Sequence, residues 1–97
     1  MIQVRRTHEF SKWLADLRDT RARLYITRRI DRLAEGNFGD SKTVGDAVSE
    51  LRINYGPGYR VYFARRGGAL VILLCGGDKA TQPRDIMRAK ALAAELD

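Results

Sequence analysis

Residues 53–63, INYGPGYRVYF, place a Gly-Pro-Gly turn between two runs with strand character. From Ser49 to the turn, apolar and polar residues alternate, which is the period of a strand with one buried face. Gly56 and Gly58 accept positive φ angles, and Pro57 stiffens the corner. The stretch therefore predicts an antiparallel β-hairpin, and the rest of the fold is built around it.

The polar face of this hairpin carries the groups that suggest chemistry. Pairing about Gly56 places Arg52 opposite or nearly opposite Arg60, with Glu50 and Tyr62 one step further along. Like charges directly opposed on a sheet repel, and a bound anion would relieve that repulsion. Two guanidiniums and a phenol on a stiff sheet suit a phosphodiester. The alternative is an exposed face on which Glu50 simply pairs with Arg52 or Arg60.

The residues after the hairpin predict a central strand and a last helix. The run ALVILLC, residues 69–75, is continuously apolar, as expected of a strand that is covered on both faces. GGDK, residues 76–79, then leads into a helix with Pro83 in its first turn. GGDK could present backbone N–H groups to a phosphate, with Lys79 adding charge, or be a turn without a ligand. The inner stripe of the helix is predicted to be Ile86, Ala89, Ala93 and Leu96.

The N-terminal half predicts a strand and two helices. Residues 1–6, MIQVRR, read as a short strand, and Thr7 can cap the helix that follows. After a polar break around Asp19, a second helix is expected to end at Gly36-Asn37. The buried stripes of the two helices are Phe10, Trp13, Leu14 and Leu17, and then Ala22, Ile26, Ile30 and Leu33. So short a break predicts antiparallel helices, and residues 37–44 are expected to form a loop.

Arginines line the outer side of the second predicted helix. Arg21, Arg28 and Arg32 project at nearly the same angle, and Arg18 lies close by. Such a stripe is either a solvated face or a surface for an acidic ligand. If it binds nucleic acid, Arg28 and Arg32 are the candidates.

The element order β-α-α-β-β-β-α predicts a single α+β domain over residues 1–97. In it, a helical hairpin packs on a mainly antiparallel sheet and one helix ends the chain. The net charge of +6 and a pI of about 10.0 predict an acidic partner. Arginine outnumbers lysine 14 to 4, which favours nucleic acid, although a GC-rich genome would produce the same count.

Several classes of protein are excluded by what the sequence lacks. The longest apolar run is too short for a membrane span and the start is not that of a signal peptide, so a cytoplasmic protein without membrane contact is expected. One cysteine and one histidine predict no disulfide, no metal and no small-molecule cofactor. Cys75 and Trp13 are expected in the core and His8 on the surface. The sequence shows no nucleophile–base pair of the kind that hydrolases use.

RNA cleavage remains compatible with these residues, because the 2′-hydroxyl of the substrate is itself the attacking group. The protein need only position it, accept its proton and stabilise the phosphate. Glu50 could be the proton acceptor if it is held clear of the arginines or its pKa is raised.

Residues 49–93, SELRINYGPGYRVYFARRGGALVILLCGGDKATQPRDIMRAKALA, resemble the RelE/ParE superfamily of type II toxins. They are most similar to the addiction-module killer proteins, a subgroup related to HigB and to phage-derived toxins. FSKWLADLRD and the basic helix after it are similar to the N-terminal helical hairpin of that superfamily. The resemblance thus spans nearly the whole chain.

The resemblance implies a small basic toxin encoded beside a cognate antitoxin. Such toxins act on mRNA in the ribosomal A site or, in the ParE branch, on DNA gyrase. Arg60 matches the strand arginine that binds the phosphate in such toxins. Arg52 matches a basic residue of the preceding strand, and Lys79 lies near the basic position after the last strand. Glu50 stands where some ribonuclease members carry lysine. Residues 81–88 contain neither the tyrosine nor the histidine of such members, so the proton-transfer role is unassigned.

The leading hypothesis is a ribosome-dependent mRNA endoribonuclease that inhibits translation and is neutralised by an antitoxin. The candidate catalytic residues are Arg60, Arg52, Lys79 and Glu50, and the candidate RNA-binding residues are Tyr59, Tyr62, Arg28 and Arg32. The alternatives are a ParE-like toxin that inhibits gyrase without nuclease activity, and a basic nucleic-acid-binding module without toxicity.

Overall fold

The structure, a computed structural model, describes residues 1–96. Its elements are β1 (Gln3–Arg6), α1 (His8–Asp16), α2 (Thr20–Ala34), β2 (Ser41–Gly45), β3 (Val48–Ile53), β4 (Tyr59–Arg66), β5 (Leu70–Gly77), the 3₁₀ helix η1 (Lys79–Thr81) and α3 (Gln82–Glu95). The strands form one sheet in the order β1-β5-β4-β3-β2. All neighbouring strands are antiparallel except β1 and β5, which are parallel. The predicted α+β class is confirmed.

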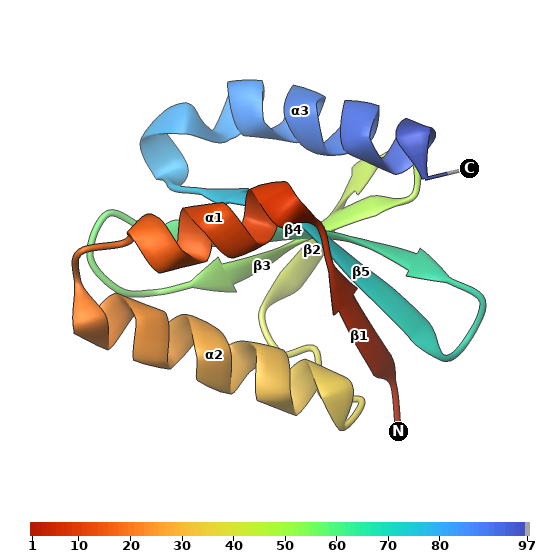
Figure 1. Cartoon of the computed structure of the whole chain (residues 1–97), viewed down its shortest axis with the longest axis horizontal. Helices are drawn as coiled ribbons and strands as arrows, with labels where there is room; N and C mark the ends of the chain where they lie inside the picture. Colours follow the sequence, from red (N-terminus) through yellow and green to blue (C-terminus); the bar gives the residue numbers. More distant parts are fainter. Residues whose placement is uncertain (97) are drawn as a thin grey trace.

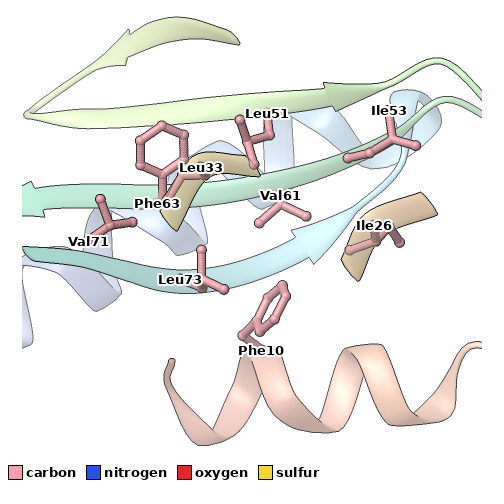
Figure 2. Close-up of a cluster of buried hydrophobic side chains, with 9 residues drawn as sticks. All are labelled: Phe10, Ile26, Leu33, Leu51, Ile53, Val61, Phe63, Val71 and Leu73. Atoms are coloured by element: carbon pink, nitrogen blue, oxygen red, sulfur yellow. The ribbon is translucent and has the colours of Figure 1, made fainter. Parts of the chain in front are cut away.

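Helices cover both faces of the sheet (Figure 1). α1 and α2 run in opposite directions on one face, as predicted, and α3 crosses the other. Each face therefore has its own core. Figure 2 shows the core under α1 and α2, which consists of Phe10, Ile26, Leu33, Leu51, Ile53, Val61, Phe63, Val71 and Leu73. The core under α3 contains Val48, Tyr62, Ala64, Leu74, Cys75, Ala89, Leu92 and Ala93.

The hairpin of β3 and β4 forms in the predicted register. Arg52 lies opposite Arg60, and Glu50 lies opposite Tyr62. At the turn, Gly56 has a φ of 57° and Gly58 a φ of 79°. Both angles lie in the left-handed region that glycine adopts without strain, so the turn is compatible with this register.

Residues 41–45 form a strand where the sequence predicted a loop. β2 pairs antiparallel with the free edge of β3. All of its side chains are exposed except Val44, which is half-buried. An edge strand solvated on both sides has no apolar alternation, and period-two patterning is the signal that the prediction used. The turn into β3 was also not predicted from the sequence, because Asp46 and Ala47 adopt positive φ angles of 54° and 61° there.

β5 is a central strand covered on both faces, as its unbroken apolar run predicts. It lies between β1 and β4. A bulge opposite Tyr62 and Phe63 turns both Leu74 and Cys75 toward α3. Cys75 is buried there, as predicted, and burial raises the pKa of its thiol to about 12.

The other predictions about core and surface residues hold with one exception. His8 is exposed, and Trp13 is partly buried against the first core. Leu96, predicted on the inner stripe of the last helix, is instead exposed, and Leu92 is buried in its place. Leu96 is the C-cap residue that follows α3.

Thr7 joins α1 to the sheet. Its Oγ1 accepts a hydrogen bond from the Phe10 backbone N–H at 3.0 Å and donates one to the Leu74 carbonyl at 2.6 Å. We expect Thr7→Ala to lower the free energy of unfolding by about 1–2 kcal/mol, because a helix cap and a partly buried hydrogen bond are lost together. Urea denaturation measures this change.

Thr27→Ala is the matched control, because Thr27 is an exposed residue in the interior of α2. We expect it to change stability by less than about 0.5 kcal/mol. Equal losses for the two threonines would show that the Thr7 bonds contribute nothing beyond local propensity.

Candidate functional site

A pocket of about 300 Å³ opens beside the Gly-Pro-Gly turn. Its lining residues are Asp40, Arg52, Ile53, Asn54, Gly56, Pro57, Gly58, Arg60 and Lys79. We call it the cationic pocket, because Arg52, Arg60 and Lys79 supply three positive charges against the single carboxylate of Asp40. Three of the four predicted catalytic residues therefore share one cavity.

These cations come from three different elements. Arg52 is in β3 and Arg60 is its partner in β4, on the face of the sheet that α3 covers. Lys79 begins η1, and its backbone N–H donates to the carbonyl of Pro57 at 3.4 Å. A Cβ on Gly58 would lie 3.3 Å from Cβ of Lys79 and 3.5 Å from Nη1 of Arg60. The glycine thus lets both cations approach the turn closely.

Glu50 lies beneath the pocket and holds both arginines. Its side chain is 1% exposed, and its Oε2 lies 2.9 Å from Nε of Arg52 and 3.4 Å from Nε of Arg60. Nε2 of Gln82, in the first turn of α3, donates to Oε1 at 2.9 Å. The hydrogen bond to Glu50 raises the pKa of the Arg52 guanidinium above its ordinary value.

This placement corrects two expectations about the hairpin's polar face. The face is not exposed at Glu50, because α3 covers it. Of the two conditions given for Glu50 as a proton acceptor, the first, a position clear of the arginines, is not met either. The alternative of internal pairing is correct as far as Glu50 is concerned, yet both arginines still line the pocket. We therefore interpret Glu50 as the carboxylate that orients them.

Arg60 is the more tightly held of the two arginines. Its side chain is 12% exposed, compared with 34% for Arg52. Nη1 donates to the carbonyls of Gly58 at 3.0 Å and Tyr59 at 3.2 Å. Its Nε is within ion-pair distance of Glu50 but lacks hydrogen-bond geometry. Arg60 thus presents a fixed guanidinium, while Arg52 is more accessible.

Neither tyrosine predicted to contact RNA lines the cationic pocket. Tyr62 is fully buried under α3, its hydroxyl has no hydrogen-bond partner, and burial raises its pKa well above the ordinary value. In this fold Tyr62 has no exposed surface with which to contact RNA. Tyr59 lies on the opposite face, edge-on to Trp13 with ring centroids 6.3 Å apart. Its side chain contributes to the core.

The glycines of GGDK are explained by packing. A Cβ on Gly76 would lie 2.3 Å from Cε3 of Trp13, and one on Gly77 would lie 1.8 Å from Oδ2 of Asp85. The two backbone N–H groups that end η1 are already bound to the side chain of Asp78, at 2.9 and 3.3 Å. These contacts favour the turn without a phosphate ligand, and Lys79 still lines the pocket.

Arg28 and Arg32 line a second pocket, of about 350 Å³, between α2 and the end of β3. We call it the helix pocket; its lining residues are Tyr25, Arg28, Arg29, Arg32, Ile53, Asn54 and Tyr55. Both guanidiniums are exposed. Because Ile53 and Asn54 line both pockets, the two cavities open side by side.

Arg29 is a structural residue that sequence reasoning did not single out. Its guanidinium donates to the backbone carbonyls of Phe38, Asp40 and Arg52. Burial lowers its pKa. The signal was present, because Arg29 falls between Ile26 and Leu33 on the buried stripe of the helix. A cation at such a position is expected to bind fixed acceptors.

Replacing Glu50 by glutamine should lower the free energy of unfolding by about 2 kcal/mol. The amide keeps the shape of the side chain but removes the buried counter-charge of two guanidiniums. Urea denaturation measures the change. Asp46→Asn is the matched control, because the pair of Asp46 with Lys90, at 3.7 Å, is exposed at its carboxylate and contributes less than about 1 kcal/mol. Wild-type stability in the Glu50 variant would show that the arginines do not depend on it.

Two further features are absent from residues 1–96. No helix in that part of the chain is long and apolar enough to cross a membrane. Histidine, cysteine, aspartate and glutamate side chains do not gather there in groups of three or more that could hold a metal ion.

Comparison with known proteins gives two matches. The family described as "Phage derived protein Gp49-like" matches residues 12–95, from within α1 to the end of α3. An uncharacterized protein of Haemophilus influenzae is 56% identical over 95 residues, which cover 98% of this chain and 96% of the relative. The family match spans every position that lines the cationic pocket.

Proposed function

The chain belongs to the phage-derived Gp49-like family, a RelE-like toxin family of toxin–antitoxin systems, and we propose that it is a ribosome-dependent mRNA endoribonuclease. As such a toxin it cleaves mRNA, inhibits translation and is neutralised by a cognate antitoxin. Within the RelE/ParE superfamily we place it with the addiction-module killer and HigB-like toxins.

The observation that carries this proposal is the convergence of Arg52, Arg60 and Lys79 on one cavity. A phosphodiester is an anion, and negative charge on its phosphoryl oxygens increases in the transition state of cleavage. Guanidiniums that are already fixed by Glu50 and by turn carbonyls stabilise that charge without having to reorganise. The volume of about 300 Å³ is at the lower end of the usual range for ligand pockets, which suits one nucleotide unit.

RNA suits the pocket better than DNA because of the groups that are absent from its lining. None of the residues that line it is a serine, cysteine, threonine or histidine, so no hydroxyl, thiol or imidazole is offered there as a nucleophile. RNA carries its own nucleophile, the 2′-hydroxyl. A protein that positions this hydroxyl in line with the phosphate supplies much of the catalysis.

The helix pocket extends the proposed RNA path. A strand with one phosphate in the cationic pocket can cross Asn54 and bring its next phosphates to Arg28 and Arg32. Both side chains are exposed, so these contacts would act mainly through charge and weaken with salt. We assign them to RNA binding rather than to the reaction.

The antitoxin is proposed to cover the same surface. A chain of net charge +6 favours an acidic segment as its partner. If that segment reaches the cationic pocket, Arg60→Ala weakens the toxin–antitoxin complex. Unchanged affinity would place the antitoxin elsewhere on the molecule.

The test is induced expression in a bacterial host, followed by primer extension on a reporter transcript. New 5′ ends that accompany growth arrest support the proposal. The purified protein should then cut mRNA on translating ribosomes and leave free mRNA intact. Intact transcripts together with cleaved DNA complexes and an SOS response would instead identify a gyrase inhibitor. Unaffected growth would identify a nucleic-acid-binding module without toxicity.

A further inference from the structure

The cationic pocket contains a carboxylate to which sequence and family resemblance assign no role. We propose that Asp40 accepts the proton of the RNA 2′-hydroxyl during cleavage. This inference rests on the proposed endoribonuclease function and supplies the proton acceptor that the function lacks.

The position of Asp40 is the first argument. It immediately precedes β2, and among the described residues that line the cationic pocket it alone carries a carboxylate. Its side chain is 61% exposed, and Oδ1 lies 4.0 Å from Nη1 of Arg52. An accessible carboxylate beside a phosphate-binding guanidinium is where a base acting on the neighbouring ribose is needed.

The backbone at Asp40 is held in place, although the sequence predicted a loop there. Its carbonyl accepts the backbone N–H of Arg52 at 3.0 Å and Nη2 of Arg29 at 3.0 Å. The preceding residue, Gly39, has a φ of 60°, and a Cβ there would lie 3.2 Å from Nη2 of Arg29. These contacts join α2, β3 and the start of β2 at one point. The carboxylate therefore extends from a fixed backbone position at the pocket.

The other proton acceptors are placed unfavourably. Glu50 already pairs with two arginines and accepts a hydrogen bond from Gln82 beneath the pocket. The hydroxyl of Tyr62 is buried under α3. His8 begins α1 and does not line the pocket. Asp40 combines access to substrate with proximity to the phosphate-binding groups.

The reaction balances with the groups of this pocket and the substrate alone. The 2′-O–H bond breaks as its proton passes to the Asp40 carboxylate, and the 2′-oxygen forms a bond to phosphorus. The P–O5′ bond then breaks, and the leaving 5′-oxygen takes a proton from the Lys79 ammonium. Arg52 and Arg60 stabilise the phosphoryl oxygens. The products are a 2′,3′-cyclic phosphate and a 5′-hydroxyl, and exchange with water restores Asp40 and Lys79 to their starting protonation states.

The test compares single-turnover cleavage of mRNA on ribosomes by the wild type and by Asp40→Asn. The amide keeps the size of the side chain but cannot accept the proton, so the rate constant should fall by about 10²-fold or more. Binding of a non-cleavable mRNA carrying a 2′-deoxy substitution should be unchanged or tighter, because a negative charge is lost from the pocket. Asp46→Asn, at the other end of β2, should cleave at the wild-type rate.

The pH profile separates proton transfer from mere positioning of Arg52. The wild type should show an acid limb in its pH–rate profile, and this limb should be missing from Asp40→Asn. Asp40→Glu should recover part of the rate and restore the limb. Equal rates for the wild type and Asp40→Asn would overturn the inference and leave the endoribonuclease function standing.

A slower Asp40→Asn with an unchanged acid limb would also overturn the inference, because the residue would then act only by positioning Arg52. A wild-type protein that cuts no mRNA would overturn the proposed function and this inference together. Thermal unfolding of each variant shows that lost activity is not lost structure.

Discussion

Replacing Arg60 by alanine should reduce the rate constant of mRNA cleavage by about 10²–10³-fold and abolish growth arrest on induction. This is the typical effect of removing one fixed donor from a developing anion. Arg60 is held by Glu50 and by two turn carbonyls, so little reorganisation is needed before it binds the phosphate. Single-turnover cleavage of mRNA on ribosomes measures the change.

The matched control is Arg65→Ala, which removes the same charge from the same strand. Arg65 is exposed, and its guanidinium lies 4.6 Å from the centroid of the Phe38 ring, away from the cationic pocket. We expect at most a small loss of activity from this variant. A comparable loss from both substitutions would mean that net charge, rather than the pocket, governs activity. Full activity of Arg60→Ala would remove the phosphate-binding role from this residue.

Arg60→Lys separates charge from geometry. Lysine keeps the positive charge but lacks the planar fork that bonds both turn carbonyls and the ligand at once. We expect Arg60→Lys to recover RNA binding to a greater extent than it recovers the rate constant of cleavage. Because Arg60 also neutralises the buried Glu50, the unfolding of each variant must be measured beside its activity.

The second large effect is expected on stability, from Gly76→Ala. The added Cβ would lie within 2.3 to 2.5 Å of three atoms of the Trp13 indole, a rigid ring that packs on Phe10 and Tyr59. The ring must leave its place or the strand must move. We expect the free energy of unfolding to fall by about 3 kcal/mol, since steric overpacking typically costs this much. For a domain of this size, that lowers the melting temperature by more than about 10 °C.

Gly68→Ala is the control for the loss of backbone freedom. A Cβ on Gly68 meets nothing within 4 Å, so its substitution tests the change from glycine to alanine without a clash. We expect little change in its melting temperature. If Gly76→Ala were equally harmless, the Gly-Gly pair would not be explained by the approach of Trp13, and a ligand role for that turn would have to be reconsidered.

Local patterns in the sequence were sufficient for most of the architecture. The register of Arg52 with Arg60, the Thr7 cap and the stripe of α2 all depend on residues that are neighbours along the chain. β2 was missed for the corresponding reason. A strand that is exposed on both sides of a sheet edge has no pattern of burial to display.

The candidate site could be predicted from the sequence only in part. Arg52, Arg60 and Lys79 could be named from the hairpin and from the family resemblance, and the fold brings all three to one cavity. Arg28 and Arg32 were also named, and they line the adjacent pocket.

The sequence by itself determined the hairpin, its register, the order of most elements and the excess of positive charge, because each follows from local spacing or composition. Only the tertiary structure decided which polar residues of the hairpin reach solvent. Alternation separates two faces of a strand, but it does not show that α3 covers the face that carries Glu50 and Tyr62. Nor does alternation show that Asp40 lies beside Arg52 at the pocket. That contact depends on the pairing of β3 with a segment that has no alternation of its own.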